Sequence, residues 1–357
     1  MSKNRTIPNY PLDTLQTEIE RVIMSIEQSD VQKFAERPME FVDSSFDEDE
    51  VRFLVTARLS LIAAGMIEYA VDTTERGQRT FADKLVSTLV ENISHVSDLS
   101  KLRQESRQQF VDEIVSLGKH ASLKDINELA IYLSKMSGQL KLEENIAVAK
   151  FIGDNFVMFP YGNKSASSIS FRKLVNELYA SEVEFSGEEQ QILHNTFKSI
   201  IENGNAYDTS KAFKGIGKFL RITPIFFDEN LDLILDSLHN HRDDRHEFHR
   251  ILASFSGRVT QVIRDFSDDL SDEDLKIRMG KVELIFTLLA QDPDPSVRTA
   301  IAEEIGIAIG KLSQFDHGLG NIVTILSEDD HPDVQSTIAR QIDQGIIQPS
   351  GTSAFGR

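Results

Sequence analysis

The sequence DPDPSVRTAIAEEI, residues 292–305, decides the expected fold of this chain. It recurs 37 residues later as the related sequence DDHPDVQSTIARQI, residues 329–342. The apolar residues before it recur in the same register: Ile285, Leu288 and Leu289 reappear as Ile322, Ile325 and Leu326. A repeat of this length is typical of stacked helical units, in which each unit buries its apolar face against the next. The sequence therefore predicts a stack of similar units.

Within each copy, a turn separates two helices. Residues 292–295 interrupt an apolar segment, and proline is well tolerated in the first turn of a new helix. Val297 is then followed by isoleucines at four-residue spacing, which places these side chains on one face of a helix. Pro332 and Val334 begin the same arrangement in the second copy. Each copy is therefore expected to be a helical hairpin that needs a neighbour to cover its apolar face.

The same helical spacing of apolar residues extends over almost all of the chain between residues 12 and 345, and no stretch shows the alternation of a β-strand. The sequence therefore predicts an all-α protein. Short loops favour neighbouring helices that run antiparallel. The expected helices span 12–29, 47–71, 77–95, 98–118, 122–137, 141–153, 168–180, 187–203, 208–221, 228–240, 244–266, 272–291, 295–312, 317–327 and 332–345.

The motif from Asp292 to Arg298 resembles a HEAT repeat of the subtype with an Asp-Pro-x-Val-Arg turn, and the resemblance is clearest over residues 281–345. It implies an α-solenoid of antiparallel helix pairs, with the turn joining the two helices of a pair. In that family the valine faces the core and the arginine bonds an aspartate of its own or a neighbouring unit. Gln335 stands where the arginine would recur in the second copy. The residues to which the resemblance gives a structural role are Asp292, Pro295, Val297, Arg298, Pro332 and Val334.

One segment interrupts the helical pattern and suggests a division of the chain. Between Phe156 and Ser168 the turn-forming sequence Pro-Tyr-Gly-Asn is followed by small polar residues. Residues 347–357 combine Pro, Gly, Ser and Thr with little apolar content, which predicts a disordered tail. The expected organisation is an N-terminal helical lobe at 1–158, a linker or long loop at 159–168, a C-terminal HEAT-like lobe at 169–346 and the tail at 347–357.

The composition excludes several kinds of chemistry and partner. The 357 residues include no cysteine, which excludes disulfides, thiolate catalysis and cysteine-ligated zinc. With 57 acidic and 38 basic residues the formal net charge is -19, and a field of this sign repels nucleic acids and anionic membranes. The most apolar stretch is too short to span a bilayer, and residues 1–13 lack the apolar core of a signal peptide. We expect a cytoplasmic protein with no membrane partner.

Four cations of this acidic chain have the spacing of one helix face: Lys211, Lys214, Lys218 and Arg221. We call them the basic stripe. Its functional interpretation is a docking site for a protein partner with an acidic segment, for a phosphate or for a nucleic-acid backbone. The more common role of such residues is a solvated face that balances acidic neighbours. Gly215 and Gly217 weaken the helix that would carry the stripe.

Four histidines lie within eleven residues: His239, His241, His246 and His249. On a helix, His246 and His249 share a face and so are candidates for binding one metal ion. The HEAT-like deoxyhypusine hydroxylases bind iron through repeated His-Glu pairs, and only His246-Glu247 matches such a pair here. A solvated loop and helix start with locally paired charges is therefore the favoured interpretation. No cofactor is expected.

The function expected from these patterns is binding without catalysis. The sequence contains neither a Gly-rich phosphate loop nor a Gly-x-Ser-x-Gly elbow. Stacked helices present a long surface to a partner protein, which suits a protein–protein interaction scaffold, an adaptor or a regulatory subunit. The alternative is a metal-dependent enzyme or regulator that uses the histidines of residues 239–249. A nucleic-acid-binding HEAT-like protein is the least favoured class, because of the net charge.

Overall fold

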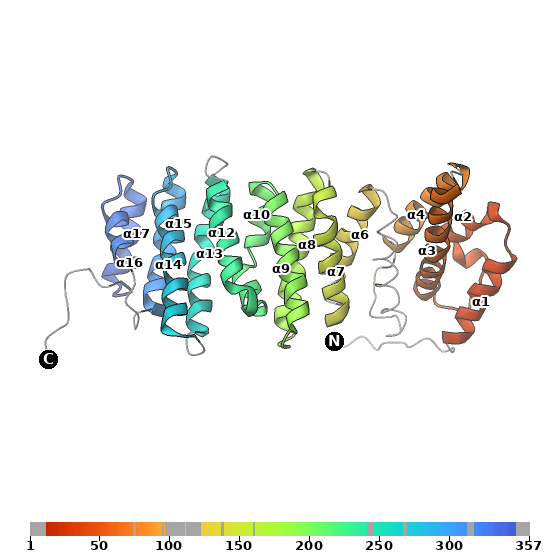
Figure 1. Ribbon diagram of the computed structural model, residues 1–357, viewed down its shortest axis with the longest axis horizontal. Coiled ribbons are helices and arrows are strands. Elements are labelled where there is room, and N and C mark those ends of the chain that lie inside the picture. Colours follow the sequence, from red (N-terminus) through yellow and green to blue (C-terminus); the bar gives the residue numbers. More distant parts are fainter. Residues whose placement is uncertain are drawn as a thin grey trace. The chain divides into compact units, whose positions relative to one another are not determined.

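Every regular element of the described chain is helical, which confirms the all-α prediction (Figure 1). The computed structural model describes residues 12–73, 76–94, 96, 111, 123–136, 139–159, 161–240, 246–266, 270–312 and 318–347. The helix expected at 98–118 lies outside these ranges except for Val111. The chain forms two compact units, Met1–Glu177 and Leu178–Arg357. In the described ranges, no helix combines the length and the apolar character needed to cross a membrane.

The first unit is built around α3, a long helix that contacts α1, α2 and α4. Its apolar residues are buried on several sides, from Val51 through Leu59, because neighbours cover more than one face of it. Further along the chain α4 packs on α6, and α6 packs on α7. The elements are α1 (Leu12–Ser25), α2 (Gln28–Glu36), η1 (Pro38–Glu40), α3 (Glu48–Thr73), α4 (Arg76–Ser94), α6 (Leu123–Lys135), α7 (Leu142–Asn155), η4 (Phe156–Met158) and α8 (Tyr161–Ala180), whose last turn enters the second unit.

The helices of the second unit form two rows of contacting neighbours. In row 1, α9 contacts α12, α12 contacts α14 and α14 contacts α16; in row 2, α10 and α11 contact α13, α13 contacts α15 and α15 contacts α17. Consecutive helices from α13 to α17 also pack on each other, so the two rows share one core (Figure 1). The elements are α9 (Gly187–Asn203), α10 (Ala206–Phe213), α11 (Ile216–Ile222), η5 (Pro224–Phe226), α12 (Phe227–Asn240), α13 (His246–Asp265), α14 (Asp272–Ala290), α15 (Pro295–Leu312), α16 (Leu319–Ser327) and α17 (Pro332–Asp343).

Local signals set several helix starts in this unit. Ser186 accepts a hydrogen bond from the N–H of Glu189, whose side chain accepts one from the N–H of Ser186, so this capping box begins α9 where the sequence predicts it. The helices α15 and α17 begin at Pro295 and Pro332, where the fixed φ of proline suits a first turn. Val297 is fully buried behind the first of these prolines.

Three parts of the structure differ from the sequence-based expectations. The first is α2, which occupies a stretch expected to be mostly loop. Its N-cap residue, Glu27, makes no side-chain cap, so the usual start signal is missing. Phe34 and Ala35 are nonetheless buried, because α2 packs on α3 and α4. Tertiary burial therefore stabilises a helix that has little local signature.

The second difference concerns the expected linker at 159–168, which is helical from Tyr161 onward as the start of α8. Ser167, Ser168 and Ser170 are buried, so the small polar residues serve as close-packing positions rather than as a loop. Ser170 donates its hydroxyl to the carbonyl of Ala166, which satisfies that group inside the helix.

The third difference is a break in the helix expected at 208–221. The turn at Lys214 and Gly215 divides it into α10 and α11. Glycine is a poor helix former, which favours a break at this position. At the other end of the unit, Ile347 is buried although it falls in the expected tail, while residues 348–357 lie outside the described ranges.

Candidate functional site

In row 2, the fourth residue of each of the helices α13, α15 and α17 bonds to a turn between two helices of the second unit. These residues are His249, Arg298 and Gln335. His249 on α13 pairs through Nδ1 with the carboxylate of Asp292, the first residue of the turn between α14 and α15. Both side chains are buried. A residue of one helix start therefore fixes the turn that leads into the next.

Arg298 on α15 repeats this arrangement one turn later. Its Nε lies 2.6 Å from Oδ2 of Asp329, and its Nη2 lies 3.0 Å from Oδ1 of the same carboxylate, so the pair is bidentate. Its Nη1 donates to the carbonyl oxygen of Asp292 at 2.8 Å. Gln335 donates to the carbonyl of Asp329 at 2.6 Å, the corresponding bond in the next turn. Arg298 thus ties two successive turns together.

These contacts set the ionisation of Asp329. Burial raises the pKa of this carboxyl, but hydrogen bonds from Arg298 and from the backbone N–H of His331 outweigh the burial, so the pKa lies below its ordinary value. The same pair raises the pKa of Arg298, chiefly through its hydrogen bond to Asp329. Both groups are therefore charged throughout the physiological pH range.

The sequence comparison of the two copies does not reveal the place of His249 in this arrangement. Counting back one period from the first copy reaches Arg258 and Thr260, inside α13 rather than at its start. The actual start, His246, lies farther back mainly because α14 has 19 residues whereas α16 has 9. A signal was nevertheless present in the sequence. The residue that bonds the turn aspartate is the fourth residue of its helix, and in α13 that residue is a histidine rather than an arginine.

The candidate metal histidines are not assembled into a site by the described residues. His239 is exposed in the last turn of α12, His249 is buried against Asp292, and His241 and the side chain of His246 lie outside the described part. In that part of the chain, no three His, Asp or Glu side chains are placed to hold a metal ion. The pair with Asp292 gives His249 a role in holding a turn.

The structure places the basic stripe on α10, the turn after it and α11. All four side chains are partly exposed. The Nζ of Lys211 lies 3.8 Å from the ring centre of Tyr207, and that of Lys218 lies 5.6 Å from the ring centre of Tyr179. Arg221 pairs with Asp265 of α13. The side chain of Lys214 forms no ion pair or hydrogen bond with any residue that the structure describes, while its backbone N–H donates to the carbonyl of Ala212. Three lysines and two exposed tyrosine rings therefore remain accessible to a partner.

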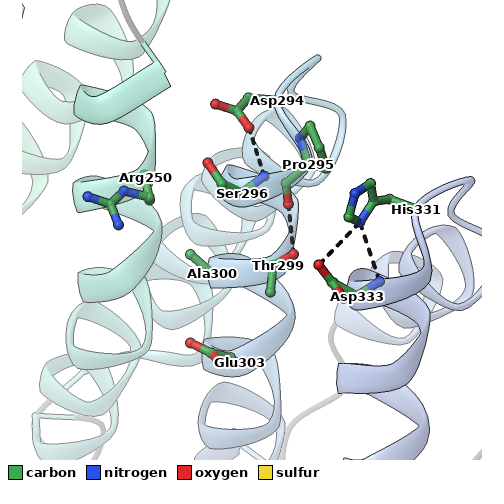
Figure 2. A pocket seen from close by; sticks show the side chains of 9 residues that line it. All are labelled: Arg250, Asp294, Pro295, Ser296, Thr299, Ala300, Glu303, His331 and Asp333. Atoms are coloured by element: carbon green, nitrogen blue, oxygen red, sulfur yellow. Dashed lines mark hydrogen bonds and ion pairs between the residues drawn. The ribbon is translucent and has the colours of Figure 1, made fainter.

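A pocket of about 430 Å³ opens between the starts of three row 2 helices (Figure 2). Arg250 of α13 lies on one side, Glu303 lies farther along α15, and His331 and Asp333 at the start of α17 lie on the other side. Asp294 accepts from the N–H of Ser296 at 2.8 Å at the rim. Carboxylates outnumber cations here, so the pocket is suited to a basic side chain.

A second pocket, of about 470 Å³, lies in the first unit between the end of α2, the start of α3 and α4. Two of its acidic residues are Glu36 and Glu48. Arg52 donates to Glu48 at 2.8 Å and to Oδ1 of Asn92 at 3.0 Å, so the charge within the pocket is partly neutralised. This arrangement stabilises the contact of α3 with α4 and indicates no reaction.

No protein-family model matches the chain, and no curated protein is similar to it in sequence. The site is therefore interpreted from its own geometry.

Proposed function

We propose that this chain is a non-catalytic protein–protein interaction scaffold, adaptor or regulatory subunit, built as a HEAT-like α-solenoid of antiparallel helix pairs. The observation that supports it is the row 2 surface, where side chains from equivalent positions of successive helices converge. The pocket of Figure 2 takes its lining from the starts of α13, α15 and α17. A surface that draws on several helices in turn is how stacked helical units contact an extended partner.

The first contact region to test is the basic stripe on α10 and α11. Its lysines form a local positive patch on a chain whose net charge is -19, and the Nζ atoms of Lys211 and Lys218 lie over exposed tyrosine rings. An ammonium group on an aromatic ring is held in place and still presents its remaining donors to a carboxylate. An acidic segment of a partner protein fits this surface.

The test is affinity capture from native lysate with quantitative mass spectrometry. The variant Lys211→Glu, Lys214→Glu, Lys218→Glu leaves Arg221 in its pair with Asp265, so the contact of α11 with α13 persists. The matched control reverses three exposed lysines elsewhere, Lys150→Glu, Lys198→Glu and Lys276→Glu, with the same change in net charge.

We expect wild type and control to recover the same acidic partner, and the stripe variant to recover at least about tenfold less of it. A charge at the edge of an interface acts only within about one Debye length, so reversing lysines elsewhere should leave this interface unaffected. Equal recovery by the stripe variant would remove the stripe from the interface. Recovery of no partner by any of the three proteins would contradict the scaffold proposal.

A further inference from the structure

An exposed apolar line runs along α14 in row 1, away from the pocket and the basic stripe. Ile277, Leu284 and Leu288 are 52%, 48% and 40% exposed, and their spacing of seven and four residues places them on one side of the helix. Ile325 on α16, 37% exposed, occupies the place of Leu288 in the second copy of the repeated sequence. Because α14 and α16 are in contact, the line continues from one helix to the next.

Gly280 lies in the middle of this line, between Ile277 and Leu284. A Cβ added at Gly280 would meet open space, so nothing in the unit requires a glycine there. A glycine inside a helix lowers its stability by about 1 kcal/mol relative to alanine. The residue leaves a shallow notch beside the line, and such a notch permits close approach by another backbone or by a large apolar side chain. Lys281, which shares this side of the helix with Ile277 and Leu284, is turned to Asp232 of α12 by its ion pair.

Carboxylates of α12 border the line on one side. Asp228 lies 2.8 Å from Arg278, and Asp232, one turn later, lies 2.6 Å from Lys281. These two ion pairs fix the register of α12 on α14, so the next turn of α12 brings the exposed Asp236 level with Leu284. Its carboxylate makes no ion pair or hydrogen bond with the described residues. Asp228 and Asp232 are therefore neutralised by cations of α14, and Asp236 is the carboxylate at this edge that stays available to a cation of a partner.

We propose that this surface of α12, α14 and α16 docks an amphipathic helix of a partner protein, with its apolar side on the line and a Lys or Arg side chain over Asp236. The line from Ile277 to Leu288 is about 17 Å long, which matches about three helical turns of the partner. Helices dock on apolar surfaces through anchors at three-, four- and seven-residue spacing, and the carboxylate of Asp236 together with the net charge of -19 favours a basic flank.

The charge also decides among other occupants. An anionic lipid surface is repelled by the net charge of -19. A second copy of this chain carries the same net charge, which disfavours self-association. The proposal does not rest on the basic stripe, since the two surfaces share no residue and lie on different rows.

The probes are two labelled peptides of about 18 residues with leucines at the same helical positions, one with lysine and the other with glutamate on the polar side. Fluorescence anisotropy with the full chain should show binding of the lysine peptide and none of the glutamate peptide. The variant Leu284→Asp, Leu288→Asp should weaken binding of the lysine peptide at least tenfold. General attraction to an acidic protein would instead become stronger, because the variant adds two negative charges.

Two further variants separate docking from folding. Ile307→Asp, at an exposed position of α15 in row 2, is the control and should bind as wild type does. Gly280→Leu fills the notch from open space, so its melting temperature should match or exceed that of wild type while peptide binding falls. Undiminished binding by Leu284→Asp, Leu288→Asp, or no binding of either peptide to wild type, would overturn the proposal. So would a wild-type dimer that this variant converts to monomers, because the occupant would then be a second copy.

Discussion

Arg298 concentrates more interactions than any other side chain discussed above. Its bidentate pair with Asp329 is nearly enclosed, since the two side chains are 12% and 5% exposed. It also caps the carbonyl oxygens of Asp292 and Pro293. A buried charge that loses its partner is costly, because the remaining charge stays away from water. This residue therefore links local turn geometry to the packing of two successive helical pairs.

We expect Arg298→Met to lower the free energy of unfolding by about 3 kcal/mol, because it leaves the Asp329 carboxylate buried and unpaired. Urea unfolding at neutral pH measures the change. Asp330→Ala is the control, since the Asp330 side chain is 91% exposed and an exposed ion pair with Arg298 contributes less than about 1 kcal/mol. A loss of similar size in both variants would show that the enclosed pair is not the source of the stability.

The same variant has a predicted pH dependence. Because folding lowers the pKa of Asp329, its contribution is complete above the ordinary carboxyl pKa of about 4 and is lost as pH falls through the lower pKa of the folded state. The difference between wild type and Arg298→Met should therefore be largest at neutral pH and shrink below about pH 4. A difference that stays constant down to about pH 3 contradicts this linkage.

His249 yields a prediction that separates a structural from a metal-binding role. His249→Ala removes the buried partner of Asp292 and should lower the free energy of unfolding by about 2 kcal/mol. The loss should be the same with and without EDTA, because the bond joins two side chains. If EDTA lowers the stability of wild type to that of the variant, and elemental analysis finds a stoichiometric ion, His249 belongs to a metal site.

At the scale of the element, two glycines inside helices illustrate opposite environments. Gly306 of α15 lies against Gln341 of α17, and a Cβ there would overlap the side chain of Gln341. That side chain donates to the carbonyl oxygens of Ala302 and Glu303 at 2.7 and 3.1 Å. Gly306 therefore permits the close approach of α15 and α17, whereas Gly280 of α14 faces open space.

We expect Gly306→Ala to destabilise the chain by about 2 kcal/mol, because the methyl group displaces Gln341 from its hydrogen bonds. Gly280→Ala should instead stabilise it by about 0.5–1 kcal/mol through helix propensity alone. Denaturant unfolding of the two matched variants provides the measurement. A neutral Gly306→Ala would mean that α17 moves aside without loss.

At the scale of the whole molecule, the basic stripe and the surface around the apolar line differ in the charges that they carry. The net charge of -19 is unevenly distributed, since the three lysines of the basic stripe lie on α10, the turn after it and the start of α11, while exposed carboxylates of α12 border the apolar line of α14. We therefore propose different partners for the two surfaces, acidic segments at the stripe and basic helices at the apolar line. The two can be occupied independently.

Much of the helical content was predictable, because it depends on local patterns. The capping box at Ser186 and the prolines at 295 and 332 mark helix starts that the structure confirms. The same reasoning misses α2 and the first turns of α8, where burial rather than a start signal stabilises the helix. It also passes over the break at Gly215, where the stripe bends from α10 to α11.

The sequence by itself determined that this protein is all-α and that two C-terminal segments share one pattern, because apolar spacing and turn residues act within a few positions of the chain. The tertiary structure alone decided that His249 holds Asp292, that Arg298 joins Asp292 to Asp329, and that α12 lies beside the apolar line of α14. These contacts join residues from different helices. Their register depends on helix lengths and packing, which no local pattern specifies.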